Sequence, residues 1–515
     1  MASTLFPSRA MFMGWIAAIS LLAHGIVPTQ AQTAQYGVQG VTAYEPNQLI
    51  GFAYSHAAAS GVATPDGVAQ AIELIYREDG FLLAEVEILV QADGSLLFFV
   101  HEGHIEQITI EGVDEGLFGA IKGYLAPLAG QRPLTQAGFE RALMLASDLS
   151  GVSLTTEFDY PDGMQGARLT VTGETRRHAG AITIDNPPRE LGKAISLRVT
   201  EEIYSLLIPG DMLRLNGSVT GHHDTVGDGY SLAGTAYYRA PIGASGLYAE
   251  AFAGNVIGER DGSGAFADTE LRGFEGGVLL GFPIRRSLHD YSYLLGEYRH
   301  SSVESEGGGI GFTSGVHAAS GMLLYGHDSA EGAPTRLGVI ATGGWRDGSA
   351  PPGEDDGDDQ FWHLRAAFAT SQPLYALHED VSVVFDIHGQ WTNARLPSVE
   401  EFYLGSRDSL RGYRNGEVSG DSGFSGSLEL HHIAETGGPI TRINSYAFLD
   451  FGHVRNNAPG ANEVAEMSLA SAGVGLRAYL DNGFSAHGWL GVPLADGVST
   501  GRYEPAGLIG LTKAW

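Results

Sequence analysis

The strongest constraint on this chain is an alternation of apolar and polar residues that recurs from about Arg177 to the C-terminus. In residues 381–391 the odd positions are mostly apolar and the even ones mostly polar, and residues 213–220 and 473–480 also alternate. Successive side chains of a β-strand point to opposite faces, so these segments are predicted strands with one apolar and one polar face. The 73 glycines, and the lack of a long apolar run beyond the N-terminus, argue against a helical enzyme and against helical membrane spans.

A lone carboxylate interrupts the predicted strand Tyr446–Gly452. With a period of two, one face carries Tyr446, Phe448, Asp450 and Gly452, and the other face is wholly apolar. Such strands suit a membrane β-barrel, in which the apolar face meets lipid and the mixed face lines the lumen. Asp450 is therefore expected on the interior face.

The segment Leu396–Tyr413 is predicted to be a loop that folds back into this lumen. Its core is Leu410, Arg411, Gly412 and Tyr413. A glycine between a bulky cation and an aromatic residue allows a sharp turn, so the tip of the loop can present both side chains. An enclosed arginine needs an acidic partner, and the strand carboxylate described above is the expected one.

A different pairing is compatible with the same residues. Arg411 could reach a carboxylate in an external loop, while Asp450 pairs with a lumen arginine such as Arg477. A soluble sandwich would also alternate, but its polar face would meet bulk water on an open sheet.

Four motifs follow one another within about sixty residues, and together they are far more specific than any one alone. In order, they are Phe402-Tyr403-Leu404-Gly405, Leu410-Arg411-Gly412-Tyr413, Gly420-Asp421 with Leu428-Glu429-Leu430, and Phe448-x-Asp450-x-Gly452. This order resembles the outer-membrane transporters of two-partner secretion (TpsB type, ShlB/FhaC/HecB family) of the Omp85 superfamily. Leu410 and Ser406 depart from it, because valine or isoleucine and a second glycine are usual there.

The resemblance implies a transmembrane β-barrel of about 16 antiparallel strands, preceded by two small α+β domains of the polypeptide-transport-associated (POTRA) type. It also implies that the arginine of the inward loop pairs with the strand aspartate. The C-terminal Trp515 resembles the terminal aromatic of outer-membrane barrels. The expected parts are a signal peptide at 1–31, a leader at 32–41, POTRA domains at 42–104 and 105–175, and the barrel at 176–515 with its inward loop near 396–420.

Two tandem units precede the barrel. The first combines a helix from Thr64 with a hairpin whose turn is Asp93-Gly94, and the second repeats this order with a hairpin around Asp162-Gly163. An Asp-Gly pair between apolar runs is a good hairpin signal. The predicted helices of the second unit span Gly116–Leu128 and Thr135–Leu149.

The N-terminus and the composition indicate an exported protein. Arg9, the apolar run Met11–Val27 and the small residues near Ala31 have the order of a secretory signal peptide. No cysteine is present, so no disulfide stabilises the fold. The formal charge of −30 makes nucleic-acid binding unfavourable. The acidic run Glu354–Asp359 reads as a solvated loop, since it lacks the ligand spacing of a calcium site.

The sequence gives little support to an enzymatic function. The chain lacks the Gly-x-Ser-x-Gly elbow of serine hydrolases, and a lumen lining explains His317 and Ser320 equally well. The pairs His222-His223 and His431-His432 suggest a metal, yet adjacent strand residues point to opposite faces. We therefore expect no enzymatic activity, no cofactor and no metal.

The function expected from the resemblance is export of an unfolded secreted partner, bound through the POTRA domains, across the outer membrane by a monomeric transporter. A barrel-assembly insertase is the alternative, although such proteins usually carry three to five periplasmic units. A passive porin is the least supported hypothesis, because it does not explain the N-terminal units or the inward arginine.

Overall fold

The computed structural model describes residues 36–187, 193–224, 227–260, 269–307, 310–330, 332–348, 359–460 and 463–515. It divides into two compact units, one consisting mainly of residues up to 106 and the other of most of the remaining chain. The predicted signal peptide and residues 354–358 of the acidic run lie outside the described residues. Among the described residues, no helix has both the length and the apolar character to cross a membrane.

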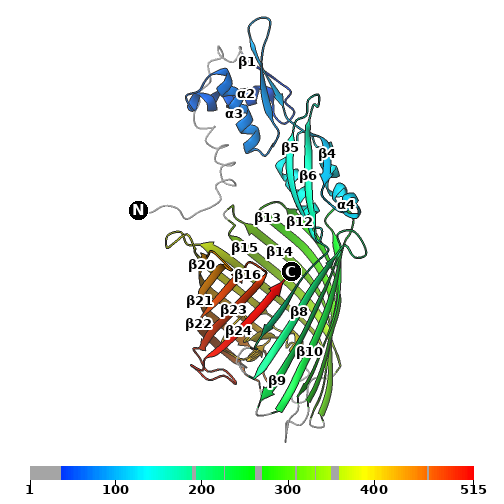
Figure 1. The fold of residues 1–515 in the computed structure, drawn as a ribbon, viewed down its shortest axis with the longest axis vertical. Coiled ribbons are helices and arrows are strands. Elements are labelled where there is room, and N and C mark those ends of the chain that lie inside the picture. The colour runs from blue at the N-terminus through cyan, green and yellow to red at the C-terminus, as the bar shows by residue number, and fades with distance from the viewer. Residues whose placement is uncertain are drawn as a thin grey trace. The chain divides into compact units, whose positions relative to one another are not determined.

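The first unit is a three-stranded sheet with two helices (Figure 1). Its elements are β1 (Tyr36–Gln39), α2 (Pro46–Ala59), α3 (Pro65–Glu78), β2 (Glu85–Val90) and β3 (Leu96–His101). The strand order is β1-β3-β2. The Thr64 side chain accepts a hydrogen bond from the Gly67 N–H and so caps α3, the helix expected there.

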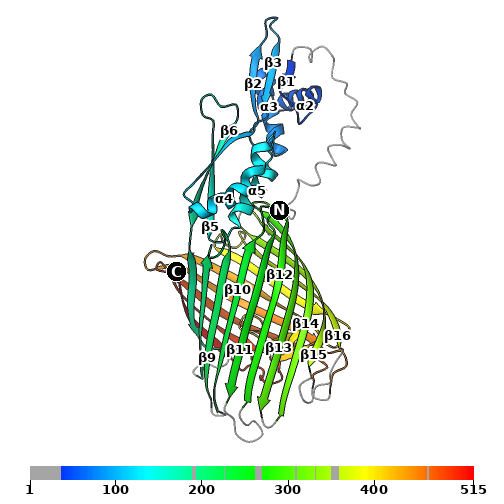
Figure 2. The same ribbon diagram turned by 90° about the vertical axis from the view of Figure 1, so that its right-hand side faces the viewer.

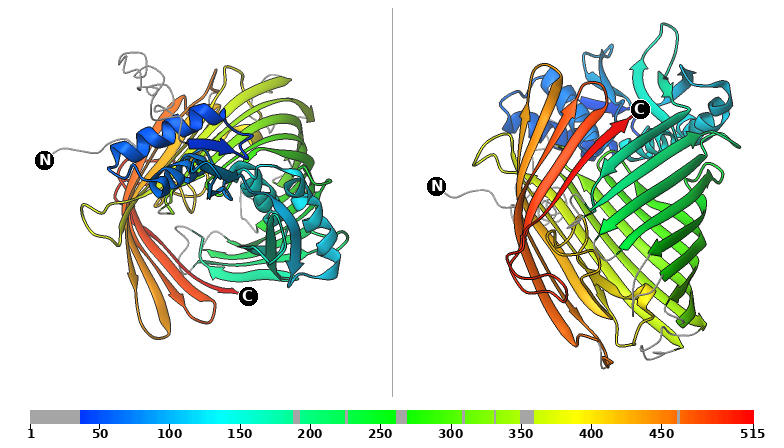
Figure 3. Two further views of the ribbon diagram at one scale, coloured as in Figure 1. Left: turned by 90° about the horizontal axis from the view of Figure 1, so that it is seen from above. Right: turned by 60° about the horizontal axis from the view of Figure 1, so that its bottom comes forward.

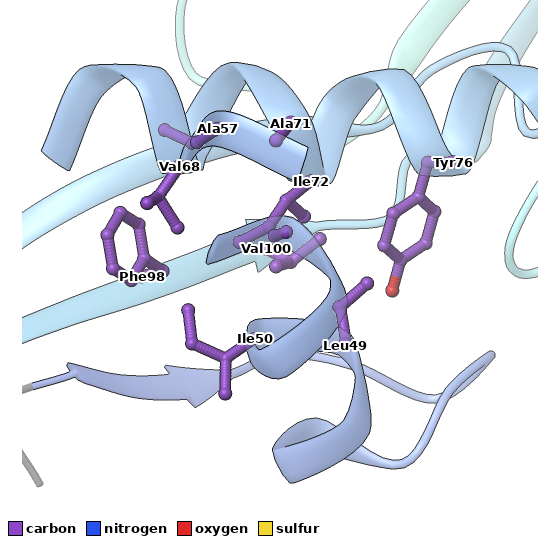
Figure 4. Packing of buried hydrophobic residues seen from close by; sticks show 11 residues of the cluster. Leu49, Ile50, Ala57, Val68, Ala71, Ile72, Tyr76, Phe98 and Val100 are labelled. Carbon is purple, nitrogen blue, oxygen red and sulfur yellow. The ribbon is translucent and has the colours of Figure 1, made fainter. Parts of the chain in front are cut away.

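The core of this unit lies between the helices and the sheet. Leu49 and Ile50 of α2, Ile72 of α3, and Phe98 and Val100 of β3 are all buried and pack together (Figure 4). One finding differs from the sequence analysis. Residues 36–39, expected in a leader, form β1 and pair with β3. Four residues are too few for a period-two pattern to stand out.

A second α+β unit follows, with the strand order β4-β6-β5. Its elements are β4 (Ile105–Glu111), α4 (Glu115–Leu125), the 3-10 helix η2 (Ala126–Gly130), α5 (Gln136–Ser147), β5 (Val152–Asp159) and β6 (Ala167–Thr175). Ile121, Leu145 and Leu169 are buried in its core. The two α+β sheets are consistent with two POTRA domains.

Sixteen strands then form a closed antiparallel barrel (Figures 2 and 3). They are β7 (His178–Asp185), β8 (Ala194–Tyr204), β9 (Met212–Asp224), β10 (Gly227–Pro241), β11 (Tyr248–Arg260), β12 (Thr269–Arg286), β13 (Asp290–Gly307), β14 (Ile310–Asp328), β15 (Pro334–Gly348), β16 (Gln360–Pro373), β17 (Val381–Trp391), β20 (Ser422–Glu435), β21 (Ile440–Arg455), β22 (Glu466–Leu480), β23 (Phe484–Pro493) and β24 (Ala506–Ala514). The predicted barrel and its strand number are confirmed.

The barrel closes where β24 pairs with β7 over five residue pairs, fewer than any other adjacent barrel strands share within the described residues. Asn186 extends this seam beyond the strand, because its side chain donates to the Gly507 carbonyl (3.0 Å) and accepts from the Ile509 N–H (2.8 Å). The two hydroxyl groups of Thr183 and Thr512 also meet across the seam at 2.9 Å. Side-chain hydrogen bonds thus supplement the short ladder.

Candidate functional site: the inward loop and its lumen contacts

The loop between β17 and β20, residues 392–421, contains the short elements η4 (Ser398–Glu400), β18 (Phe402–Leu404) and β19 (Val418–Gly420). Strands β18 and β19 pair with each other as a hairpin. Phe402, Leu404 and Leu410 pack against Val454 and Leu469 of the barrel strands, and Leu404 and Leu410 have no exposed surface. The loop therefore has a small apolar core of its own, shared with the inner face of the barrel.

Arg411 and Asp450 are in direct contact. The Arg411 side chain donates to the carboxylate of Asp450 from Nε (2.9 Å) and Nη2 (2.6 Å), and its backbone N–H also donates to that carboxylate (2.9 Å). Asp450 is completely buried. Paired, parallel hydrogen bonds between guanidinium and carboxylate are among the strongest in proteins and fix geometry as well as charge.

Further groups complete the environment of this guanidinium. Glu429 of β20 approaches Arg411 Nη1 to 2.5 Å, and Ser427 Oγ accepts from Nη2 at 2.9 Å. The ring of Phe448 stacks against the guanidinium, with its centroid 3.6 Å from Cζ. The alternative partner Arg477 instead lies over the Tyr446 ring. We call Arg411 with Asp450, Glu429 and Ser427 the tip anchor.

The neighbouring motif residues support this contact in different ways. Gly412 has φ +103°, and a Cβ there would lie 3.2 Å from the backbone of Gly491 on β23. Tyr413 is fully buried, and its hydroxyl lies 2.9 Å from the carbonyl oxygens of both Ala470 and Ala495. The glycine permits a close approach, while the tyrosine ties the loop to β22 and to the connection after β23.

The strand motif faces the lumen as predicted from its period. Phe448, Asp450 and Gly452 are buried, whereas Leu449 between them is exposed on the opposite face. Gly452 lies against Leu404 and Leu410, since an added Cβ would come within 2.9 Å of both side chains. The glycine of this motif therefore makes room for the loop.

The sequence analysis missed several loop contacts. Arg407 forms a double hydrogen bond with Asp185 of β7, a carboxylate that Arg198 also binds. Glu417 accepts hydrogen bonds from the backbone N–H groups and the side-chain hydroxyl groups of Ser499 and Thr500. These partners are far apart in sequence, and single polar residues in alternating strands carry no signal of pairing.

Beside the tip anchor is a lumen cavity of about 560 Å³. Four arginines line it: Arg198, Arg407, Arg411 and Arg477. Its acidic residues are Asp408 and Glu429, and its aromatic ones Tyr446, Tyr479 and Trp489. Within the part of the chain that the structure describes, no group of three or more potential ligand side chains could hold a metal ion.

The closed barrel, the tandem α+β units and the inward loop whose arginine binds a strand aspartate define the class of the protein as a transmembrane β-barrel with two N-terminal α+β units. The family model of the haemolysin secretion/activation protein ShlB/FhaC/HecB matches residues 313–478. This segment runs from β14 to β22 and includes the inward loop and the strand motif, and over it the chain is similar to that family.

Three individual proteins are similar to this chain in sequence or in fold. The outer membrane transporter CdiB-2 of Burkholderia pseudomallei (strain 1026b) is 29% identical over 143 residues, which is 27% of this chain and 22% of that protein's length. CdiB from Escherichia coli has a similar structure, with a TM-score of 0.71 and 17% identity over 99% of this chain and 100% of that one. CdiB from Acinetobacter baumannii has a TM-score of 0.65 and 15% identity, with both chains covered completely.

Proposed function

We propose that this protein exports an unfolded secreted polypeptide from the periplasm, and that its two POTRA domains capture this partner before it enters the barrel. The observation that carries the proposal is the inward loop, which enters the lumen and is bound there through the buried ion pair of Arg411 and Asp450. A barrel of sixteen strands leaves an aqueous channel unless something obstructs it, and the inward loop supplies that obstruction.

The capture step is supported by unpaired sheet edges. In the described residues, β2 pairs only with β3 and β5 pairs only with β6, so each unit presents one antiparallel edge strand. A partner segment can add to such an edge through backbone hydrogen bonds, which give affinity without strict sequence demands. This mode suits a long, unfolded substrate.

We infer a non-catalytic role for the lumen charges. Asp450, Glu400 and Asp185 are buried, and arginine side chains bind each of them. These carboxylates therefore hold structure in place, and translocation would draw its free energy from binding and folding of the exported chain. We also expect the transporter to act as a monomer.

The experiment removes residues 44–104, which contain most of the first α+β unit. Export of the partner is expected to fail while the barrel still inserts, because the barrel strands are untouched. The readouts are the partner in the medium, the partner in the periplasm, and the heat-modifiable gel mobility of the folded barrel. Normal export by the truncated protein would refute the capture role.

The same strains separate export from barrel assembly. An exporter predicts that one large secreted protein accumulates in the periplasm when the transporter is absent. An insertase instead predicts a general decrease of outer-membrane barrels, measured by quantitative proteomics of the outer membrane.

A further inference from the structure

A second buried charge cluster holds the beginning of the inward loop. Glu400 ends the helix η4 and has no exposed surface. Its carboxylate accepts hydrogen bonds from Arg299 Nη2 (2.6 Å) and His363 Nε2 (3.0 Å), and Arg365 lies 3.5 Å away. The Glu400 carbonyl oxygen accepts from Arg365 (3.1 Å) and Gln390 (3.0 Å). We call Glu400 with these four partners the base anchor.

The base anchor contacts a different sector of the wall from the tip anchor. Arg299 lies on β13, His363 and Arg365 lie on β16, and Gln390 lies on β17, so the contacts of Glu400 bridge a sector that includes β14 and β15 and ends beside β20. Leu396, just before η4, packs against Val316 of β14 in the same region. The tip anchor instead uses β20 and β21.

The two anchors also have opposite polarity. At the tip, a loop arginine enters a set of wall carboxylates, whereas at the base a loop carboxylate enters a set of wall cations. A buried charge that loses its partner costs several kcal/mol, so neither anchor is released without replacement contacts. If Arg411 and Glu400 exchanged places, each would lie among wall residues of its own charge. The charges therefore favour one orientation of the loop.

We propose that Glu400 is a second retaining residue of the inward loop, and that the loop leaves the lumen only when the base anchor and the tip anchor are both broken. This inference rests on the proposed function, in which the loop obstructs the export path. The anchors are joined mechanically, because β18 lies between Glu400 and Arg411 in the chain, pairs with β19 beyond Arg411, and shares an apolar core with Leu410. A loop freed at one anchor is therefore still held at the other.

The test uses the absence of cysteine in the full-length chain. Ser409→Cys places a reporter beside the tip, where Ser409 Oγ lies 2.5 Å from Ser425 Oγ of β20. Its labelling by a small maleimide is measured in outer-membrane preparations for Ser409→Cys alone and combined with Glu400→Gln, Asp450→Asn or both. Glu270→Gln is the matched control, because Glu270 pairs with Arg272 on β12 away from the loop.

The expected result is a labelling rate raised roughly threefold or less by each single change, and by about tenfold more than the product of the two in the double variant. Rates that simply multiply in the double variant would overturn the proposal, and so would a double variant that is labelled no faster than Asp450→Asn alone. If Glu400→Gln lacks the gel mobility of a folded barrel, Arg299→Gln replaces it from the wall side and must give the same pattern.

Labelling requires no exported partner, so this result and the proposed function can fail separately. Cooperative labelling with export unaffected by loop release would leave the two-anchor retention standing and reject the obstructing role of the loop. Independent labelling with normal export would reject the two-anchor retention and leave the proposed function standing.

Discussion

At the scale of single residues, charge burial decides where the loop lies. Arg411 satisfies its guanidinium with Asp450, Glu429 and Ser427; Asp450 and Ser427 are buried, and Glu429 is partly exposed to the lumen cavity. Such a pair adds little net stability over an apolar contact, but loss of one member leaves a buried, unpaired charge. The pair therefore specifies position more than it stabilises the barrel.

Charge reversal at this pair follows from that argument. Arg411→Asp and Asp450→Arg are each expected to cost about 3–5 kcal/mol of loop retention, since each places two like charges together. The expected results are a larger pore conductance in planar bilayers and impaired export. The double exchange should recover part of both readouts, and two harmless single changes would show that the contact has no function.

Glu102 plays a comparable part in the first α+β unit. It accepts hydrogen bonds from the backbone N–H groups of Thr42 (2.7 Å) and Ala43 (2.8 Å) and from the Tyr76 hydroxyl (2.7 Å). Partial burial alone would raise the pKa of Glu102, but these hydrogen bonds outweigh burial and hold the pKa below its ordinary value of 4.5. The carboxylate therefore favours the folded unit.

The pH dependence has a definite sign. Because the folded pKa is lowered, the stabilisation by Glu102 is complete above the unfolded pKa and is lost as pH falls through the folded pKa. Glu102→Gln should destabilise this unit by roughly 1–3 kcal/mol near neutral pH and lose part of its acid sensitivity. Hydrogen exchange of residues 42–104 at neutral and acidic pH measures both effects, and an unchanged acid profile would argue against the assignment.

At the scale of elements, the inward loop is a packed unit rather than an irregular connection. Its hairpin, its apolar core and its contacts with β23 require close backbone approach at Gly412. Gly416 also has a positive φ, of 63°, but the nearest atom to an added Cβ there is 3.9 Å away. A side chain at either glycine would thus meet backbone strain, but only one at Gly412 would also meet a crowded neighbour.

Alanine substitution separates these effects. Gly416→Ala is expected to cost about 1 kcal/mol from the left-handed backbone alone. Gly412→Ala should cost about 1–3 kcal/mol more, because its Cβ presses on the backbone of β23. The temperature at which the heat-modifiable gel mobility is lost compares the variants, and equal values would exclude a role for the close approach.

At the scale of the whole molecule, the barrel wall and the loop form one connected structure. The loop binds β7 through Arg407, β13 and β16 through Glu400, and β21 through Arg411. It also receives hydrogen bonds at Glu417 from the connection between β23 and β24. If the lumen is the export path, as proposed, we expect passage of a polypeptide to require many of these contacts to break together.

A reversible disulfide tests that requirement. Ser409→Cys with Ser425→Cys joins the loop to β20 at two side chains that already touch, in a chain with no other cysteine. Export is expected to stop under oxidising conditions and to return with a reductant, whereas either single cysteine should export normally under both. Export by the oxidised double variant would mean that the loop tip stays in place during transport.

The sequence by itself determined the barrel, the lumen face of Asp450 and the order of the motifs, because strand periodicity and turn chemistry are local properties. It also indicated most helices of the α+β units, but not α2 or the short strand β1. Only the tertiary structure decided that Glu400, Arg407 and Glu417 hold the loop. Their partners lie on distant strands, and register and closure of the sheet set which buried charges meet.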